Sequence, residues 1–295
     1  MSFPDRFWQY LVSFRWGGSS LAALYLSVIS GIILSWQFEA TEPYYSSASL
    51  ELVVPCGSFW RACHFYSSQV FFLLLVGHFL VVVLKRRRQF LAMAGANGND
   101  LGRGGGEENW GRLYLTLPVS LLLLFTGYVL RGDATGYSAG MIGENIILAL
   151  PWAGNLLNPL LFNISQAGMR VVYANHLIGL GVIAGGLAWP HLRRYRINIG
   201  DHSWLVTAIL GFSLLVPAPF DPFRVGTFHI LGPWFFIGIQ ELLRYIQPIW
   251  GGIAFPLIAL GLGYQVMVAP ADRRSFLGLA IWGAVYLLFT IIGLF

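Results

Sequence analysis

Four histidines in two apolar stretches constrain the fold of this chain more than any other feature. His64 and His78 are 14 residues apart in one stretch, and His176 and His191 are 15 residues apart in another. On an α-helix these separations are about four turns, roughly 21–23 Å, so both members of a pair return to nearly the same face. Two such helices side by side would present two facing imidazole pairs, one near each surface of a bilayer core about 30 Å thick.

Facing imidazole pairs on neighbouring helices predict two haem groups, because bundles hold haem iron between such axial ligands. The two irons would lie roughly 20 Å apart. The chain has two cysteines, Cys56 and Cys63, and no C-x-x-C-H motif, so we expect b-type haem held by histidine alone. The alternative is that each histidine is an ordinary hydrogen-bonded polar group. Polar groups inside a membrane are costly, which makes four matched ones by accident improbable.

The composition predicts an integral membrane protein. The chain is 56% hydrophobic and only 11% charged, about half the charged share of a soluble domain. We predict an all-α, polytopic membrane protein with about seven transmembrane helices, of which the first four form a four-helix dihaem bundle. The expected spans are 19–38, 65–84, 112–130, 172–190, 204–219, 249–269 and 275–295. The net charge of +5 does not indicate nucleic-acid binding, because the basic residues gather at helix ends.

Two further apolar stretches, 145–162 and 233–243, are ambiguous, and the basic residues decide their placement. With seven spans and a cytoplasmic N-terminus, 13 of the 18 basic residues face the cytoplasm, as the positive-inside bias requires. They are Arg6, Arg15, Lys85, Arg86, Arg87, Arg88, Arg103, Arg112, Arg193, Arg194, Arg196, Arg273 and Arg274. A span at 145–162 would move three of them outside. We therefore expect both stretches to lie along the outer surface, and segments 85–108 and 192–203 to face the cytoplasm.

This topology also fixes how the histidines pair. The second and fourth spans run in the same direction, from outside to inside. His64 is therefore expected opposite His176 near the outer face, and His78 opposite His191 near the inner face.

Several short motifs around the histidines are shared with one known family. They are Trp16-Gly17, Ser30-Gly31, Gly57 through His64, Gly77-His78, Gly127 through Leu130, and Pro217 through Pro222. From about Phe14 to Pro270 the chain resembles the cytochrome b family of quinol–cytochrome c and plastoquinol–plastocyanin oxidoreductases. It is most similar to the plastid-type branch fused to its subunit IV. The resemblance implies a four-helix dihaem cytochrome at 1–200 and a three-helix quinone-site domain at 201–295.

The resemblance also implies roles for glycines and arginines near the histidines. Gly17, Gly31 and Gly127 would leave room for flat macrocycles against the backbone. Ordinary packing of small residues between helices explains Gly17 and Gly31 equally well. Arg61 and Arg170, at the outer ends of their helices, would bind haem propionates, or alternatively lipid headgroups.

The outer quinone-site motif of the family, Pro-Glu-Trp-Tyr, is altered here to Gly232-Pro233-Trp234-Phe235. The acid is absent and the tyrosine has lost its hydroxyl. Oxidation of a quinol needs a titratable group within hydrogen-bond reach, so we expect no bifurcated oxidation of the family's usual kind. Glu144 is the first substitute base, with a solvated surface acid as its alternative role. Asp133 and Glu241 are weaker candidates.

On the inner side, Asp201 and His202 at the start of the fifth span are candidate proton donors to a reduced quinone. The alternative is that Asp201 caps the helix and His202 is solvated.

The expected function is electron transfer across the membrane between the quinone pool and an outer redox partner. That partner would be a c-type cytochrome or a Rieske-like iron–sulfur subunit, in a multi-subunit complex of a bacterial cytoplasmic membrane. Whether the complex is dimeric stays open. One alternative is a quinone-reactive anchor of a periplasmic multihaem or iron–sulfur enzyme. A haem-free transporter or scaffold is the other, and it would predict inverted repeats that the sequence lacks.

Overall fold

The structure, a computed structural model, describes residues 3–96, 110–222 and 230–295. It is 80% helix, with no strand among the described residues. The predicted all-α fold class is therefore confirmed. Residues 97–108 of the cytoplasmic segment expected at 85–108 lie outside the described residues.

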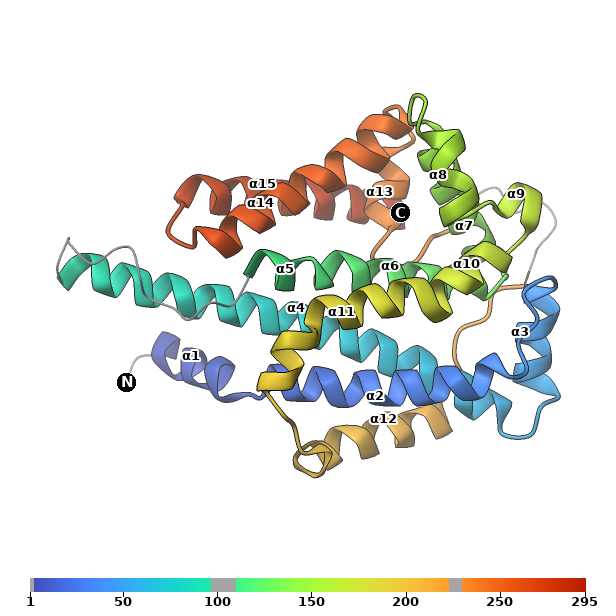
Figure 1. Cartoon of the computed structure of the whole chain (residues 1–295), viewed down its shortest axis with the longest axis horizontal. Helices are drawn as coiled ribbons and strands as arrows, with labels where there is room; N and C mark the ends of the chain where they lie inside the picture. Colours follow the sequence, from blue (N-terminus) through green and yellow to red (C-terminus); the bar gives the residue numbers. More distant parts are fainter. Residues whose placement is uncertain (1–2, 97–109, 223–229) are drawn as a thin grey trace.

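Long apolar helices run along the long axis of the molecule (Figure 1). In the part of the chain that the structure describes, six segments are long and apolar enough to cross a membrane: α2 (Trp16–Ser35), α4 (Gly57–Ala96), α5–α6 (Trp110–Tyr114 and Thr116–Leu130), α10–η1–α11 (Arg170–Ala174, Asn175–Gly179 and Leu180–Arg194), η3–α14 (Ile249–Ala254 and Phe255–Val268) and α15 (Arg273–Leu294). They correspond to six of the seven expected spans. The remaining one is the shorter α12 (Ser203–Leu215), which follows the single turn η2 (Ile199–His202). The chain is an integral, multi-pass membrane protein.

Shorter helices gather at one end of the long ones (Figure 1). They are α3 (Pro43–Leu52), α7 (Ala134–Leu148), α8 (Gly154–Leu161), α9 (Ile164–Ala167) and α13 (Ile237–Leu242). The ambiguous stretch 145–162 is not one helix. It breaks after Leu148, where Trp152 adopts a positive φ of 59°. The other ambiguous stretch, 233–243, contains only the six-residue α13. At the opposite end of the molecule, α1 (Phe3–Ser13) precedes α2.

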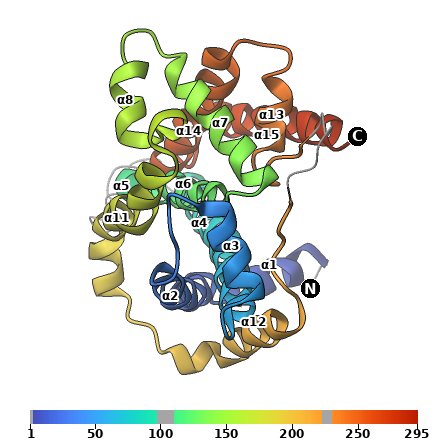
Figure 2. The ribbon, with the colours of Figure 1, turned by 90° about the vertical axis from the view of Figure 1, so that its right-hand side faces the viewer.

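Seen along the long helices, α2, α4, α6 and α11 form the central group (Figure 2). α12 packs on one side of it, where Ala23, Leu205 and Ile209 share a buried cluster. α14 and α15 lie on the other side of the group, where Tyr114 and Met267 belong to a second cluster. Helices after residue 200 therefore flank the central group on both sides.

Small residues line the contact between α2 and α4. On α2 the buried positions are Ser19, Ser20, Ala22, Ala23, Ser27 and Ser30, and on α4 they include Ala62, Cys63 and Ser67. Inside a membrane, small side chains allow two helix backbones to approach closely and gain van der Waals contact. The two cysteines are both free, Cys63 buried and Cys56 exposed.

Candidate cofactor site

The four histidines form the two pairs that the sequence predicts. The ring centroids of His64 and His176 are 6.2 Å apart, and those of His78 and His191 are 6.3 Å apart. The first pair joins α4 to the π-helical turn η1, and the second joins α4 to the end of α11. The two pairs lie at different depths of the same helix group.

The spacing of each pair suits one metal atom between two imidazoles. Two metal–imidazole bonds of about 2 Å each, plus about 1 Å from each bonded nitrogen to its ring centroid, give roughly 6 Å between centroids. No group of three or more His, Cys, Asp or Glu side chains gathers in the described ranges to hold a bare metal ion. Two imidazoles alone suit a metal whose other ligands come from a macrocycle, which is the donor set of haem iron.

Hydrogen bonds orient both rings of the outer pair. His64 Nδ1 lies 2.8 Å from the carbonyl of Ser27, which can only accept, so Nδ1 carries the proton. His176 Nδ1 lies 2.9 Å from Thr126 Oγ1, and that hydroxyl donates to the carbonyls of Leu122 and Leu123. Thr126 therefore accepts from His176. Both Nε2 atoms keep their lone pairs, which is the state a metal ligand needs.

Three glycines lie directly against three of the four imidazoles. A Cβ at Gly31 would lie 2.9 Å from His64 Cε1, one at Gly127 would lie 3.1 Å from His176 Cε1, and one at Gly17 would lie 3.1 Å from His78 Cε1. Larger residues would push the rings out of place. Close backbone approach to the histidines is therefore what these glycines provide.

Arg61 and Arg170 have different surroundings. Arg61 is buried and committed to protein partners: Nε donates to Glu51 at 2.6 Å, and Nη2 donates to the Ala218 carbonyl at 2.6 Å. It therefore ties the outer end of α4 to the segment after α12. Arg170 is the first residue of α10 and is exposed, six residues before His176. Of the two, Arg170 better fits the propionate-binding role.

Glu144 is buried and structural, which corrects the expectation of a solvated surface acid. It is 1% exposed, and its oxygens accept from Asn158 Nδ2 at 2.7 Å, from Ser165 Oγ at 2.9 Å and from Ser165 N at 3.0 Å. The carboxylate therefore fastens α7 to α8 and α9. Asp133 is equally buried and caps α7 through Gly136 N at 2.8 Å.

Asp201 and His202 lie together at the start of α12, but neither matches its alternative role. Asp201 forms an exposed ion pair with Arg15 at 2.6 Å, while the N-cap residue of α12 is His202. His202 is buried, not solvated, and its Nδ1 lies 3.1 Å from Ser19 Oγ. An acid and an imidazole are thus held against the inner end of α2.

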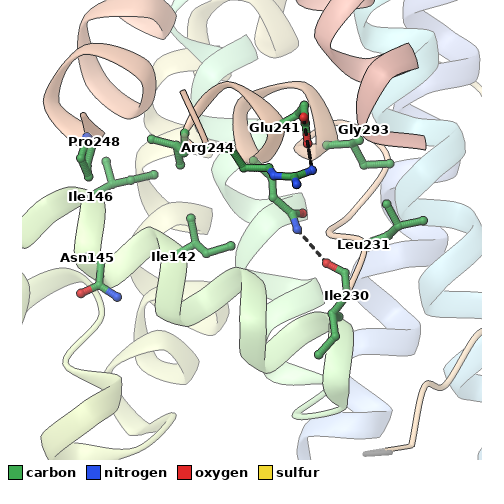
Figure 3. A pocket seen from close by; sticks show the side chains of 12 residues that line it. Ile142, Asn145, Ile146, Ile230, Leu231, Glu241, Arg244, Pro248 and Gly293 are labelled. Atoms are coloured by element: carbon green, nitrogen blue, oxygen red, sulfur yellow. Dashed lines mark hydrogen bonds and ion pairs between the residues drawn. The ribbon is translucent and has the colours of Figure 1, made fainter. Parts of the chain in front are cut away.

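A cavity of about 450 Å³ lies between α7, α13 and the end of α15 (Figure 3). Its apolar lining includes Ile142, Ile146, Ile230, Leu231, Ile237 and Leu243, and its polar lining is Asn145, Gln240, Glu241 and Arg244. It adjoins the altered motif Gly232 to Phe235. Glu144 is not among the lining residues, whereas Glu241, the weaker candidate from sequence, is one of them. A sequence pattern could not reveal this, because it does not show which side of a six-residue helix faces a cavity.

Comparisons with known proteins agree with this geometry. The cytochrome b(N-terminal)/b6/petB family matches residues 104–198, which include His176 and His191. Cytochrome b6 of Heliobacterium modesticaldum is 27% identical over 196 residues, covering 62% of this chain and 81% of the relative. Cytochrome b6 of Heliomicrobium gestii is 28% identical over 201 residues, covering 63% and 84%.

The fold is also similar to a solved one. A chain of a hyperthermophilic respiratory Complex III superposes with a TM-score of 0.63 at 19% identity, over 100% of this chain and 85% of the other. The fold and the paired histidines define a membrane helix bundle with two facing imidazole pairs. Together, the family match, the curated relatives and the fold support a member of the cytochrome b family.

Proposed function

We propose that this chain is the dihaem b-type cytochrome of a quinone-linked oxidoreductase complex. His64 and His176 would hold the outer haem, and His78 and His191 the inner one. The observation that carries the proposal is the pair of centroid separations, 6.2 and 6.3 Å, between histidines of the same helix group.

The residues around each pair fit the group that the family implies. Gly17, Gly31 and Gly127 keep side chains away from the rings, while Ser27 and Thr126 hold the outer imidazoles in the metal-binding tautomer. When bound, haem iron supplies reversible one-electron transfer, and two such groups provide two stations across the membrane core. The chain contributes ligand orientation and an apolar surround.

On the inner side we propose that Asp201 and His202 form the quinone site and supply protons to a reduced quinone. The buried imidazole and the adjacent acid support this, since two titratable groups lie side by side there and a proton donor must be within hydrogen-bond reach of the ligand that it serves. The outer redox partner is a separate iron–sulfur or c-type cytochrome subunit in this proposal. The four-helix unit 1–200 carries the haems, and 201–295 contributes to the quinone sites from both flanks.

The first test replaces His78 by Leu in the purified protein. We expect loss of the inner haem with much of the outer haem retained, because the outer pair keeps both ligands. Oxidised and reduced absorption spectra, with haem extracted and counted, measure the result. Two intact low-spin haems in this variant would contradict the ligand assignment. Absence of haem from the unaltered protein would favour the haem-free scaffold.

The second test changes Asp201 to Asn and His202 to Ala. We expect quinone-linked reoxidation of reduced haem to slow by about 10²–10⁴-fold if both proton donors act in that step. Stopped-flow spectroscopy follows the reoxidation. The haem spectrum is the internal control. It must stay unchanged, because the variants keep His191. Unaltered kinetics would remove these two residues from the proposed site.

A further inference from the structure

Glu241 is a buried carboxylate that lines the cavity between α7, α13 and the end of α15. It is 2% exposed, and it comes from α13, two turns after the altered motif. Tyr245 Oη donates to Glu241 Oε1 at 2.9 Å, and Arg244 Nη1 donates to Glu241 Oε2 at 3.0 Å (Figure 3 shows the arginine pairing). Hydrogen bonds to the carboxylate raise the pKa of both Arg244 and Tyr245. These contacts favour an ionised Glu241.

The rest of the cavity is built around this one acid. Gln240 uses both ends of its amide on the backbone, donating to the Ile230 carbonyl at 2.7 Å and accepting from Gly232 N at 2.7 Å. It therefore fixes the segment that carries the altered motif and is committed to that structural role. The volume of about 450 Å³ and the mainly aliphatic lining fall within the usual range for small-molecule sites.

The chemistry of the lining selects a class of ligand. An apolar cavity suits a ring, and an ionised carboxylate can only accept hydrogen bonds. A ring that hydrogen-bonds to Glu241 must therefore carry a donor, as the hydroxyl of a quinol does and the carbonyl of a quinone does not. Glu144 and Asp133 cannot serve this cavity, because neither lines it.

We propose that Glu241 is a binding residue for the hydroxyl of a quinol ring in this cavity, in place of the acid that Gly232 to Phe235 lacks. The proposal rests on the proposed function for its ligand class. It revises the expectation that the outer side has Glu144 or water as its main acceptor. It also predicts selectivity for the reduced ring over the oxidised one.

The experiment measures binding of a decyl-substituted benzoquinol and of the matching benzoquinone to the full chain in nanodiscs. Asp201→Asn with His202→Ala removes the proposed inner site from the background. We expect the quinol to bind more tightly than the quinone, and Glu241→Gln to weaken quinol binding about tenfold, because a charge-assisted hydrogen bond becomes a neutral one. Quinone binding should change little. Isothermal titration calorimetry gives the dissociation constants.

Two further variants make the result decisive. Glu144→Gln, which alters a buried carboxylate outside the cavity, should leave both affinities unchanged. Ile142→Trp, which fills the cavity and keeps Glu241, should remove binding of both rings, and it substitutes for Glu241→Gln if that variant does not fold. Unchanged quinol affinity and selectivity in Glu241→Gln, or full binding in Ile142→Trp, would overturn the proposal. Haem spectra of the same samples distinguish this outcome from failure of the proposed function. The proposed function fails only if haem is absent.

Discussion

At the scale of single residues, the glycines beside the imidazoles decide how closely α2 and α6 approach the candidate ligands. A Cβ at Gly31 or Gly17 would lie 2.9 or 3.1 Å from the ring of His64 or His78, closer than ordinary van der Waals contact. Gly18, the neighbour of Gly17, faces His202 in the same way, with a Cβ 2.5 Å from Nε2. Consecutive glycines on α2 therefore serve different histidines, one in a ring pair and one at the proposed inner quinone site.

This division gives a prediction with a built-in control. Gly31→Leu should displace His64 and remove the outer haem, while Gly17→Leu should displace His78 and remove the inner haem. Each variant is the control for the other, because each leaves the second pair untouched. Haem stoichiometry and redox titration of the two b-type signals measure the effect. Loss of the same haem in both variants would contradict the assignment of each glycine to one ring.

At the scale of elements, the π-helical turn η1 explains the unequal histidine separations. On an α-helix, 14 residues fall about 40° short of four turns, whereas 15 residues overshoot by about 60°. A π turn takes one residue more than an α turn. η1 contains His176 and leads directly into α11, and it absorbs the fifteenth residue. Its Asn175 side chain donates to the carbonyls of Leu160 and Leu161, which anchors the turn to α8.

A one-residue deletion tests this account. Deleting Ile178, an exposed residue of η1, should convert the π turn to α-helix and restore a 14-residue separation like that of His64 and His78. Both haems should then be retained. Inserting one alanine after Leu73 in α4, which has no π turn to absorb it, should cost at least one haem. Haem counts and near-ultraviolet circular dichroism distinguish the two results, and the opposite pattern would refute the compensation.

Pro190 interrupts the backbone hydrogen bonding of α11, and Arg112 compensates for the interruption. Pro190 has no N–H, so the Gly186 carbonyl lacks its helical donor. Arg112 on α5 donates Nη2 to that carbonyl at 2.5 Å and Nε to Leu187 O at 3.2 Å. Inside a membrane an unpaired carbonyl is costly. The arginine therefore stabilises the turn that precedes His191 and joins α11 to the third span.

At the scale of the whole molecule, the two ends of the bundle have different character. The end with α3, α7, α8, α9 and α13 carries the outer histidine pair and the cavity, and the other end carries the basic run 85–88 and the segment after α11 (Figure 1). Arg86, Arg87 and Arg88 stack over the rings of Trp110, Phe276 and Trp8, which fixes the inner ends of several helices. From the positive-inside bias, we expect this end to face the cytoplasm.

Cysteine labelling in sealed vesicles tests the orientation. Ser138→Cys on α7 and Tyr195→Cys after α11 should react with an impermeant maleimide from opposite sides, Tyr195→Cys from the cytoplasmic side. Both native cysteines should first be changed to serine, because Cys56 is exposed. Reaction of both engineered cysteines from one side would require α7 and the end of α11 to share a face. The seven-span topology would then be wrong.

The sequence alone determined the all-α class, the apolar spans and the pairing of the histidines. Each follows from local periodicity, from segment length and from the distribution of basic residues, which are properties of a chain in a bilayer. Tertiary structure decided which polar groups serve the site. Glu144, Asp133 and Arg61 are held by partners 2 to 158 residues away in sequence. Glu241, by contrast, lines the cavity. Those outcomes depend on which helices pack together, because the free energy of a buried charge is set by the neighbours that solvate it and not by the residue itself.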